Sequence, residues 1–308
     1  MTDALTTIAR SGKLGQLAKG AKPADMAAMA ANPGRYVIEI KYDGHRMYAH
    51  HGIDGTVTLY ARSGADKTHK WPRLVEAMRH TPRGTWLDGE AVMLTADNDD
   101  WGSVQSALGS DDGRGSEHLT FVAFDLLGFG EHDVRSRPLA ERRVMLERLV
   151  AEADAPIALA PQYPLDQAAD RYAEWTAAGW EGAIIKDTKA PYVSGKRTQL
   201  KLKVTVTIDA VIHPATTLDG EGKYTGQIGA LVFGQYDAAG NLVERGRCSG
   251  MTDDLRAEMS AALQAGTLVG TVIEVQHMGA MPTGGLRHPQ YKRTRTDKAP
   301  KACLVSNE

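Results

Sequence analysis

The sequence predicts an α+β domain over residues 1–204, followed by a small β-barrel over residues 205–308. Two observations lead to this expectation. Up to Lys203, apolar runs of strand length alternate with segments of helical apolar spacing. After that residue the runs become short and β-rich, and Gly-containing turns join them. We therefore place the domain boundary directly after the lysine pair Lys201 and Lys203.

The first elements are expected to present a lysine. Residues 1–34 are rich in alanine and contain Pro23 and an Asn-Pro-Gly turn, so we expect one or two short helices there. Residues 36–40 then predict a buried strand that ends at Lys41. Asp43-Gly44 predicts a turn into a second strand over residues 46–50, and a hairpin of these two strands would expose the lysine.

The remaining elements follow from the same patterns. In the first domain we expect strands over residues 57–61, 86–94, 119–126 and 183–186, and helices over residues 139–153 and 165–178. In the second we expect strands over residues 204–212, 228–236, 242–247 and 271–278, with one helix over residues 252–264. About five short strands with an inserted helix fit an OB-fold, although periodicity alone also fits other small barrels.

Composition narrows the class of protein. The chain has 308 residues, a formal net charge of −2 and the apolar content of a globular protein. Any affinity for nucleic acid must therefore come from clustered cations, which occur over residues 186–203 and 287–301. The two cysteines lack metal-ligand spacing, and no leader or membrane-spanning run is seen, so we expect a cytoplasmic protein with no membrane partner.

Several short motifs occur in one fixed order along the chain. The run Lys41-Tyr42-Asp43-Gly44-His45-Arg46 places an amine nucleophile, a carboxylate and a cation together. It is followed by Arg62-Ser63-Gly64, Asp88-Gly89-Glu90, Phe124-Asp125-Leu126-Leu127, Glu181-Gly182-Ala183-Ile184-Ile185-Lys186, Lys201-Leu202-Lys203 and Arg293-Thr294-Arg295-Thr296-Asp297-Lys298. Each motif alone is weak evidence for a function. All of them in one fixed order would occur by chance far more rarely than any one of them.

This ordered series resembles the ATP-dependent DNA ligases, especially the small two-domain ligases of bacteriophages and viruses. The resemblance extends from about residue 15 to residue 301, and His288 stands where the ligase ending usually has an aromatic residue. It implies an ATP-grasp-like nucleotidyltransferase domain of antiparallel sheets and helices, followed by an OB-fold barrel. The implied activity is sealing of 3′-OH/5′-phosphate nicks in duplex DNA through a lysyl-AMP and a DNA-adenylate, with release of pyrophosphate and AMP.

The resemblance assigns the nucleophile to Lys41, which attacks the α-phosphate of ATP. An ordinary lysine is protonated at neutral pH, so its pKa must fall through nearby cations or desolvation. Lys201, Lys203 and a bound metal are suited to this, and the two lysines would also contact the α-phosphate. Triphosphate chemistry calls for Mg²⁺, with Mn²⁺ possible, and the candidate ligands are Glu181 and Asp43.

The nucleotide contacts are carried over in the same way. Glu39 is expected to accept from the adenine amino group, and Phe124 to stack on the ring. Glu90 and Arg46 are expected at the ribose, Arg62 at the 5′-phosphate of the nick and Lys186 at the nucleotide. Arg295, Asp297 and Lys298 are expected to orient the leaving pyrophosphate when the second domain closes, which predicts domain motion.

Other functions remain open from the residues alone. RNA ligases, RNA-capping guanylyltransferases and NAD-dependent DNA ligases share the lysine chemistry. The Arg-x-Asp-Lys ending argues against most RNA ligases, and the short length and the lack of zinc-type cysteines argue against the NAD enzymes. A non-catalytic OB-fold binder is a different class, and it would need no lysine nucleophile. We expect a monomer without an obligate protein partner.

Overall fold

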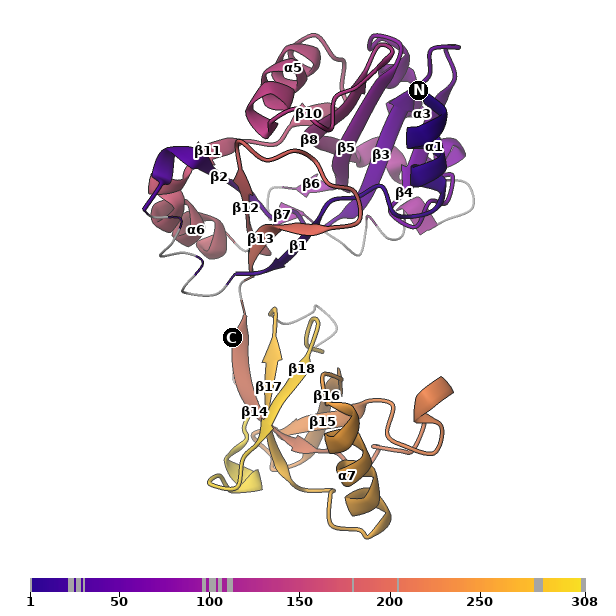
Figure 1. Ribbon diagram of the computed structural model, residues 1–308. Helices are drawn as coiled ribbons and strands as arrows, with labels where there is room; N and C mark the ends of the chain where they lie inside the picture. The colour runs from indigo at the N-terminus through magenta and orange to yellow at the C-terminus, as the bar shows by residue number, and fades with distance from the viewer. Residues whose placement is uncertain are drawn as a thin grey trace. The chain divides into compact units, whose positions relative to one another are not determined.

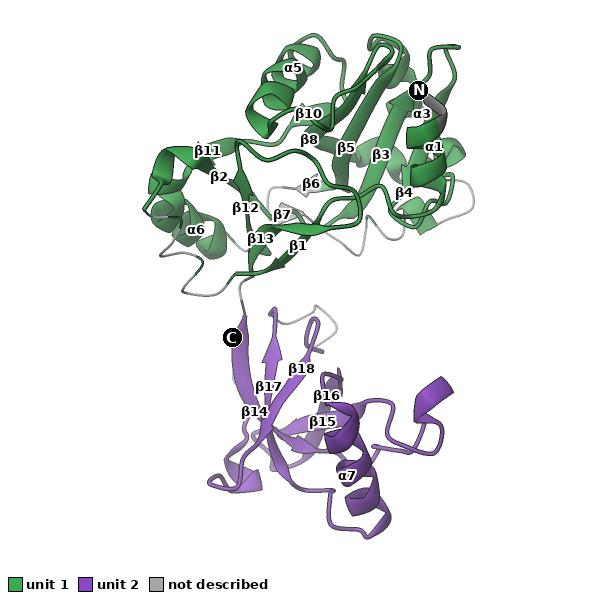
Figure 2. Ribbon diagram, viewed as in Figure 1, with its two compact units in different colours: residues 1–203 green, residues 204–308 purple. Residues whose placement is uncertain are grey.

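The computed structural model describes residues 2–21, 25, 29, 31–95, 98–99, 104, 107–109, 113–178, 180–203, 205–279 and 285–305. The chain divides into two compact units, Met1–Lys203 and Val204–Glu308 (Figure 2). We call them the first and the second unit.

The first unit contains a sheet of six strands in the order β10-β8-β5-β3-β4, with β9 added to β8 (Figure 1). Its strands are β3 (His45–His51), β4 (Val57–Ala61), β5 (Thr85–Val92), β8 (Thr120–Phe129), β9 (His132–Asp133) and β10 (Ile157–Leu159). Helix α3 (Pro72–Arg79) packs on β3 and β4, and α5 (Leu139–Ala151) packs on β8 and β10. Leu74, Leu87, Phe121 and Leu146 lie in their shared buried core. Apolar burial on this scale is the main favourable term in folding.

A second sheet of the first unit has five strands in the order β1-β13-β12-β2-β11. Its strands are β1 (Leu17–Gly20), β2 (Tyr36–Ile40), β11 (Gln162–Pro164), β12 (Gly182–Asp187) and β13 (Arg197–Lys203). Helix α6 (Ala168–Ala177) covers it and buries Trp175 against Ile38 and Ile185. The other elements of the unit are α1 (Thr2–Arg10) and the short pair β6 (Leu94–Thr95) and β7 (Asn98–Asp99).

The predicted hairpin around Lys41 is wrong. Strand β2 pairs with β11 and β12, whereas β3 pairs with β4 and β5, so residues 41–44 cross between the two sheets. A Cβ on Gly44 would come within 2.1 Å of the Ala91 carbonyl oxygen in β5. Gly44 is therefore required where the backbone passes close to β5, and not for a tight turn.

Two further expectations need correction. Part of the predicted helical region 1–34 is strand β1, because residues 17–20 pair in parallel with β13 and this pairing overrides local propensity. The pairs β1–β13 and β8–β10 are parallel, so the sheets are not wholly antiparallel. The other predicted elements are present, with ends shifted by a few residues; much of residues 22–30 lies outside the described residues.

The second unit is a five-stranded barrel with the strand order β16-β15-β14-β17-β18. Its elements are β14 (Val206–Ile212), β15 (Leu231–Tyr236), β16 (Leu242–Cys248), α7 (Asp253–Gln264), β17 (Val272–His277) and β18 (Gln290–Thr294). A parallel bridge between Ser249 and Gln290 joins the two ends of this order, and the Tyr291 amide donates to the Ser249 carbonyl at 2.7 Å. The Thr252 side chain accepts from the Leu255 amide and begins α7 as its N-cap. The expected barrel with an inserted helix is confirmed.

Candidate active site

A cavity of about 360 Å³ lies between the two sheets of the first unit. The predicted site residues that line it are Glu39, Lys41, Arg46, Arg62, Glu90, Phe124, Lys186, Lys201 and Lys203. They come from β2, β3, β5, β8, β12 and β13 and from the segments that follow β2 and β4. The tertiary fold therefore gathers motifs that are far apart in the sequence around one hollow. A hollow of this size that combines apolar walls with charged side chains is typical of a ligand site.

Lys41 lies at the end of β2 beside Glu181. The Lys41 Nζ forms an ion pair with Glu181 Oε2, and Lys203 Nζ lies 2.8 Å from Glu181 Oε1. The Glu181 side chain is only 3% exposed, whereas that of Lys41 is 21% exposed. One buried carboxylate thus holds two amines, and the Lys41 amine keeps access to the cavity.

Gly182 fixes this arrangement. Its φ is +143°, and a Cβ there would lie 2.0 Å from the Leu202 carbonyl oxygen in β13. The Lys41 amide donates to the Gly182 carbonyl at 2.9 Å. The glycine after Glu181 is therefore needed so that β12 can approach both β13 and Lys41.

Strand register explains why two lysines two residues apart reach the cavity. Lys201 pairs with Ile184 and Lys203 with Gly182, and Ile184 in turn pairs with Glu39 in β2. Alternate residues of a strand share one face. Lys201 and Lys203 therefore point to the same side of the sheet as Glu39.

Burial shifts the pKa of two cavity residues toward their uncharged forms. Burial lowers the pKa of Lys201, and the neighbouring Lys203 and Lys41 lower it further. Burial raises the pKa of Glu90 to about 8, with Asp88 and Glu181 adding to the rise and with Arg46 and Lys41 opposing it. Glu90 therefore carries a proton at neutral pH, which makes it a hydrogen-bond donor as well as an acceptor.

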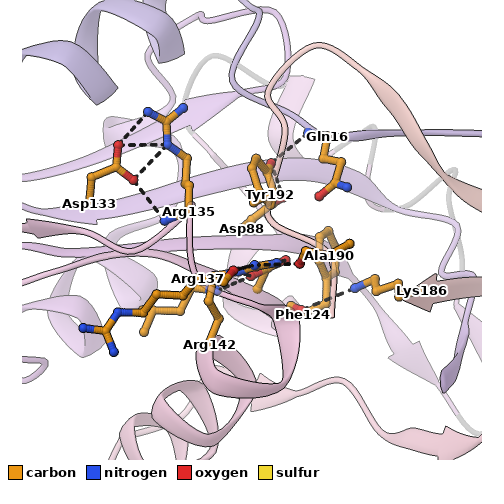
Figure 3. Close-up of polar contacts among 12 residues, drawn as sticks. Gln16, Asp88, Phe124, Asp133, Arg135, Arg137, Arg142, Lys186, Ala190 and Tyr192 are labelled. Atoms are coloured by element: carbon orange, nitrogen blue, oxygen red, sulfur yellow. Dashed lines mark hydrogen bonds and ion pairs between the residues drawn. The ribbon is translucent and has the colours of Figure 1, made fainter. Parts of the chain in front are cut away.

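Glu39 occupies a buried polar corner of the cavity. Lys186 Nζ lies 2.7 Å from Glu39 Oε2, both side chains are 3% exposed, and Gln162 Nε2 donates to Glu39 Oε1 at 2.5 Å. Lys186 also donates to the Phe124 carbonyl at 3.4 Å and lies 4.7 Å from the centre of the Phe124 ring (Figure 3). Lys186 therefore does not belong to the exposed part of the predicted basic cluster, because its charge is neutralised inside the protein.

Arg46 is held from several directions. Its Nε and Nη2 donate to the two Asp88 carboxylate oxygens at 2.9 and 2.6 Å, and its Nη1 donates to the Gln16 carbonyl at 2.7 Å. Its guanidinium carbon lies 5.4 Å from the centre of the Phe124 ring. Sequence reasoning found Arg46 and Phe124 but not Gln16, and it gave Asp88 no role although Asp88 stands in the Asp-Gly-Glu motif.

The other predicted residues of the first unit lie at the margins of the site. Arg62 is exposed and lines the cavity. Asp43 and Glu181 are buried, and among the predicted residues of this unit they are the two that do not line it. Among the described residues, no group of three or more His, Cys, Asp or Glu side chains is placed to hold a metal ion.

Arg295, Asp297 and Lys298 lie in the second unit, where Arg295 contacts Asp297 directly and shares the partner Asp209 with Lys298. Arg295 donates to both Asp297 oxygens at 2.8 and 2.9 Å and to Asp209 Oδ1 at 2.9 Å. Lys298 Nζ lies 2.7 Å from Asp209 Oδ2. Hydrogen bonds from Arg295 lower the pKa of Asp297 to about 2. Sequence reasoning did not find Asp209, which lies on β14 far from this motif in the sequence.

The two units, with this cavity in the first, define a nucleotidyltransferase followed by an OB-like barrel. The family model described as ATP dependent DNA ligase domain matches residues 15–204, and the one described as DNA ligase OB-like domain matches residues 219–295. Since the first covers more than half of the chain, this protein belongs to the ATP-dependent DNA ligase family. The predicted family is confirmed.

Relatives and solved structures agree with this assignment. A probable DNA ligase of Streptomyces coelicolor is 32% identical over 295 residues, which cover 87% of this chain and 57% of that protein. A DNA ligase of Methanoculleus marisnigri is 29% identical over 310 residues, which cover 91% of this chain and 55% of that protein. The chain thus spans little more than half the length of these relatives.

Among solved structures, the ligase domain of M. tuberculosis LigD has a TM-score of 0.55 and 25% identity, covering 96% of this chain and 99% of that one. A Lig E DNA ligase structure has a TM-score of 0.66 and 22% identity, covering 91% of this chain and 98% of that one. These likenesses confirm the predicted architecture of an adenylation domain followed by an OB-like domain.

Proposed function

We propose that this protein seals 3′-OH/5′-phosphate nicks in duplex DNA, with ATP as adenylate donor. The observation that carries the proposal is the position of Lys41. Its amine faces a cavity of about 360 Å³ beside the buried Glu181 carboxylate, and Lys201 and Lys203 line the same cavity. This combines a nucleophile, a proton acceptor and cations for a phosphate in one place.

In the first step the Lys41 Nζ attacks the α-phosphorus of ATP. A nitrogen–phosphorus bond forms, the bond from the α-phosphorus to the bridging oxygen breaks, and pyrophosphate leaves with that oxygen. The lysine must lose a proton, and Glu181 is in direct contact to accept it. In the second step an oxygen of the 5′-phosphate of the nick attacks the α-phosphorus, and the nitrogen–phosphorus bond breaks and frees Lys41. In the third the 3′-hydroxyl oxygen attacks the 5′-phosphorus, releases its proton and displaces AMP.

The other residues serve this sequence as follows. Glu39 and Phe124 recognise adenine, Glu90 and Arg46 hold the ribose, and Lys186 supports the base end of the cavity through Glu39. Lys201 and Lys203 stabilise charge on the α-phosphate. Arg62, at the exposed rim, takes the 5′-phosphate of the nick, and Asp43 lies near the incoming 3′-hydroxyl. Arg295, Asp297 and Lys298 orient pyrophosphate during closure of the second unit.

Mg²⁺, or Mn²⁺ in its place, fits the oxygen donors of this site. Glu181 is a buried carboxylate beside the nucleophile, and Asp43 is a second buried carboxylate two residues after Lys41. Mg²⁺ commonly binds through one or two carboxylates together with substrate phosphates, so a dense protein cage is not required. When bound, the ion would offset negative charge on the phosphates.

We place this reaction in the cytoplasm, with a monomer acting on nicked duplex DNA and without an obligate protein partner. The two cysteines are free and buried, as is usual in a reducing compartment. None of the helices in the described ranges is long and apolar enough to cross a membrane. One chain supplies every motif of the proposed site.

The test uses ATP labelled at the α-phosphate with Mg²⁺, followed by nicked duplex DNA. We expect label on the unaltered protein, transfer to DNA and a sealed product. Lys41→Ala should remove all labelling, whereas Lys189→Ala, at an exposed lysine outside the cavity, should not.

The outcomes separate the alternatives. Label that forms but is not transferred to nicked DNA would favour an RNA substrate. Labelling from GTP instead of ATP would favour the capping reaction, and labelling from NAD would favour the other ligase class. A protein that binds DNA but takes no label from any donor would be a binding module.

A further inference from the structure

One buried tyrosine connects several groups that line or support the cavity. Tyr192 lies in the segment between β12 and β13, is only 5% exposed and has none of the roles assigned above. Its hydroxyl donates to Asp88 Oδ2 at 2.7 Å and accepts from the Gln16 amide at 2.9 Å (Figure 3). Arg46 Nη2 donates to the same oxygen at 3.4 Å. One donor and two acceptor positions are the full capacity of a hydroxyl.

Each hydrogen-bond partner of this hydroxyl lines the cavity or supports a residue that lines it. Arg46 lines it directly and is held by Asp88, which is fully buried. Gln16 precedes β1, whose residues Leu17 and Ala18 form part of the wall. The Tyr192 hydroxyl oxygen therefore links the start of the β1 wall to the Arg46–Asp88 pair.

The Tyr192 segment is itself fixed. Its amide donates to the Arg135 carbonyl at 2.8 Å, and two residues earlier the Ala190 carbonyl accepts from the Leu139 amide at 3.0 Å and from Arg142 at 3.3 Å. Arg142 is locked in turn by a buried bidentate pair with Asp125 at 2.7 and 2.9 Å. The backbone that carries Tyr192 is thus held in place by these hydrogen bonds.

The protonation state suits this role. Burial and the adjacent Asp88 raise the pKa of Tyr192 well above its usual value, although Arg46 opposes the rise. The hydroxyl therefore remains a donor throughout the range in which an enzyme works.

We propose that Tyr192 is a positioning residue for the nucleotide, which acts by holding Arg46 through Asp88 and by fixing the start of β1 through Gln16. This rests on the proposed function, since Arg46 is taken to bind the nucleotide. Without the hydroxyl, the Gln16 amide loses its acceptor and Asp88 loses one donor. The Arg46 guanidinium and the start of β1 are then no longer held in fixed positions. Hydrogen bonds to charged groups are among the stronger ones in proteins.

The test is Tyr192→Phe, which removes only the oxygen. Calorimetric titration with α,β-methylene ATP measures nucleotide binding, because the methylene bridge blocks release of pyrophosphate. We expect the dissociation constant to rise about tenfold. The limiting rate of Lys41 labelling at saturating ATP should change much less, as for a loss of uniform binding.

Tyr48→Phe is the matched control. Tyr48 is fully buried, and its ring lies 5.8 Å from the Arg46 guanidinium carbon. Its hydroxyl hydrogen-bonds to no residue in the described part of the chain. We expect nucleotide binding by Tyr48→Phe to match that of the unaltered protein, so equal losses in both variants would refute a specific role for the Tyr192 hydroxyl.

A double-mutant cycle with Arg46→Met tests whether Tyr192 acts through Arg46. If it does, Tyr192→Phe should weaken binding by a smaller factor in the Arg46→Met background than in the unaltered protein, and the part that remains measures the contact with Gln16. Full additivity, or an unchanged dissociation constant for Tyr192→Phe alone, would overturn the inference. Failure of the unaltered protein to label Lys41 would instead count against the proposed function, because analogue binding does not depend on transfer.

Discussion

Replacing Glu90 with glutamine should stabilise the first unit, and increasingly so as the pH rises. Glu90 lies on β5 directly opposite Arg46 on β3 and lines the cavity. Burial raises its pKa from an ordinary 4.5 to about 8 in the folded protein. Between these values the folded state keeps a proton that the unfolded state has released. The free energy of unfolding therefore falls as the pH rises from about 4.5 to about 8. Above that range the whole destabilisation by the buried Glu90 carboxylate is present.

The size of the effect follows from the shift. Each pKa unit corresponds to about 1.4 kcal/mol, so the whole rise corresponds to about 5 kcal/mol. The side chain is partly accessible to solvent, which screens this cost, so we expect about half of this energy. Glu90→Gln should exceed the unaltered protein in free energy of unfolding by less than about 1 kcal/mol near pH 5 and by about 2–3 kcal/mol near pH 9.

Urea denaturation followed by tryptophan fluorescence measures this quantity. All five tryptophans lie in residues 1–203, so the signal reports the first unit alone. Glu117→Gln, at an exposed carboxylate, is the control and should leave the pH dependence unchanged. A constant difference between Glu90→Gln and the unaltered protein across this range, or a difference that shrinks with rising pH, would refute the reasoning.

Two further predictions follow from ion pairs within single units. Asp125→Ala leaves the Arg142 guanidinium buried without its carboxylate, so the free energy of unfolding of the first unit should fall by about 3–5 kcal/mol in the same urea assay; a loss under about 1 kcal/mol would contradict this. Asp209→Asn removes the carboxylate that holds Arg295 and Lys298 together, so Lys41 labelling should slow about tenfold while sealing of a pre-adenylated nick is retained. Equal loss in both reactions would argue against a role confined to the first step.

Local patterns in the sequence predicted many elements closely. Residues 36–40 and 57–61 are strands with the bounds expected from their apolar runs, and the helix expected over residues 252–264 is found at Asp253–Gln264. These features depend on neighbours within a few residues, so they can be read without the fold. The β1 strand was missed because its pairing with β13, almost two hundred residues away, outweighs the local preference of an Ala-Lys-Gly stretch.

The sequence by itself determined the order of the motifs, and with it the family and the two-part architecture, and it predicted Lys41 as the nucleophile. Only the tertiary structure decided that the chain leaves one sheet before Lys41 and enters the other sheet after it, and that the Lys41 amine contacts Glu181. Tyr192 and Asp209 carry no local signal, because their importance comes from contacts with residues distant in the chain. The raised pKa of Glu90 is likewise a property of the fold, since desolvation exists only once the surrounding strands have assembled.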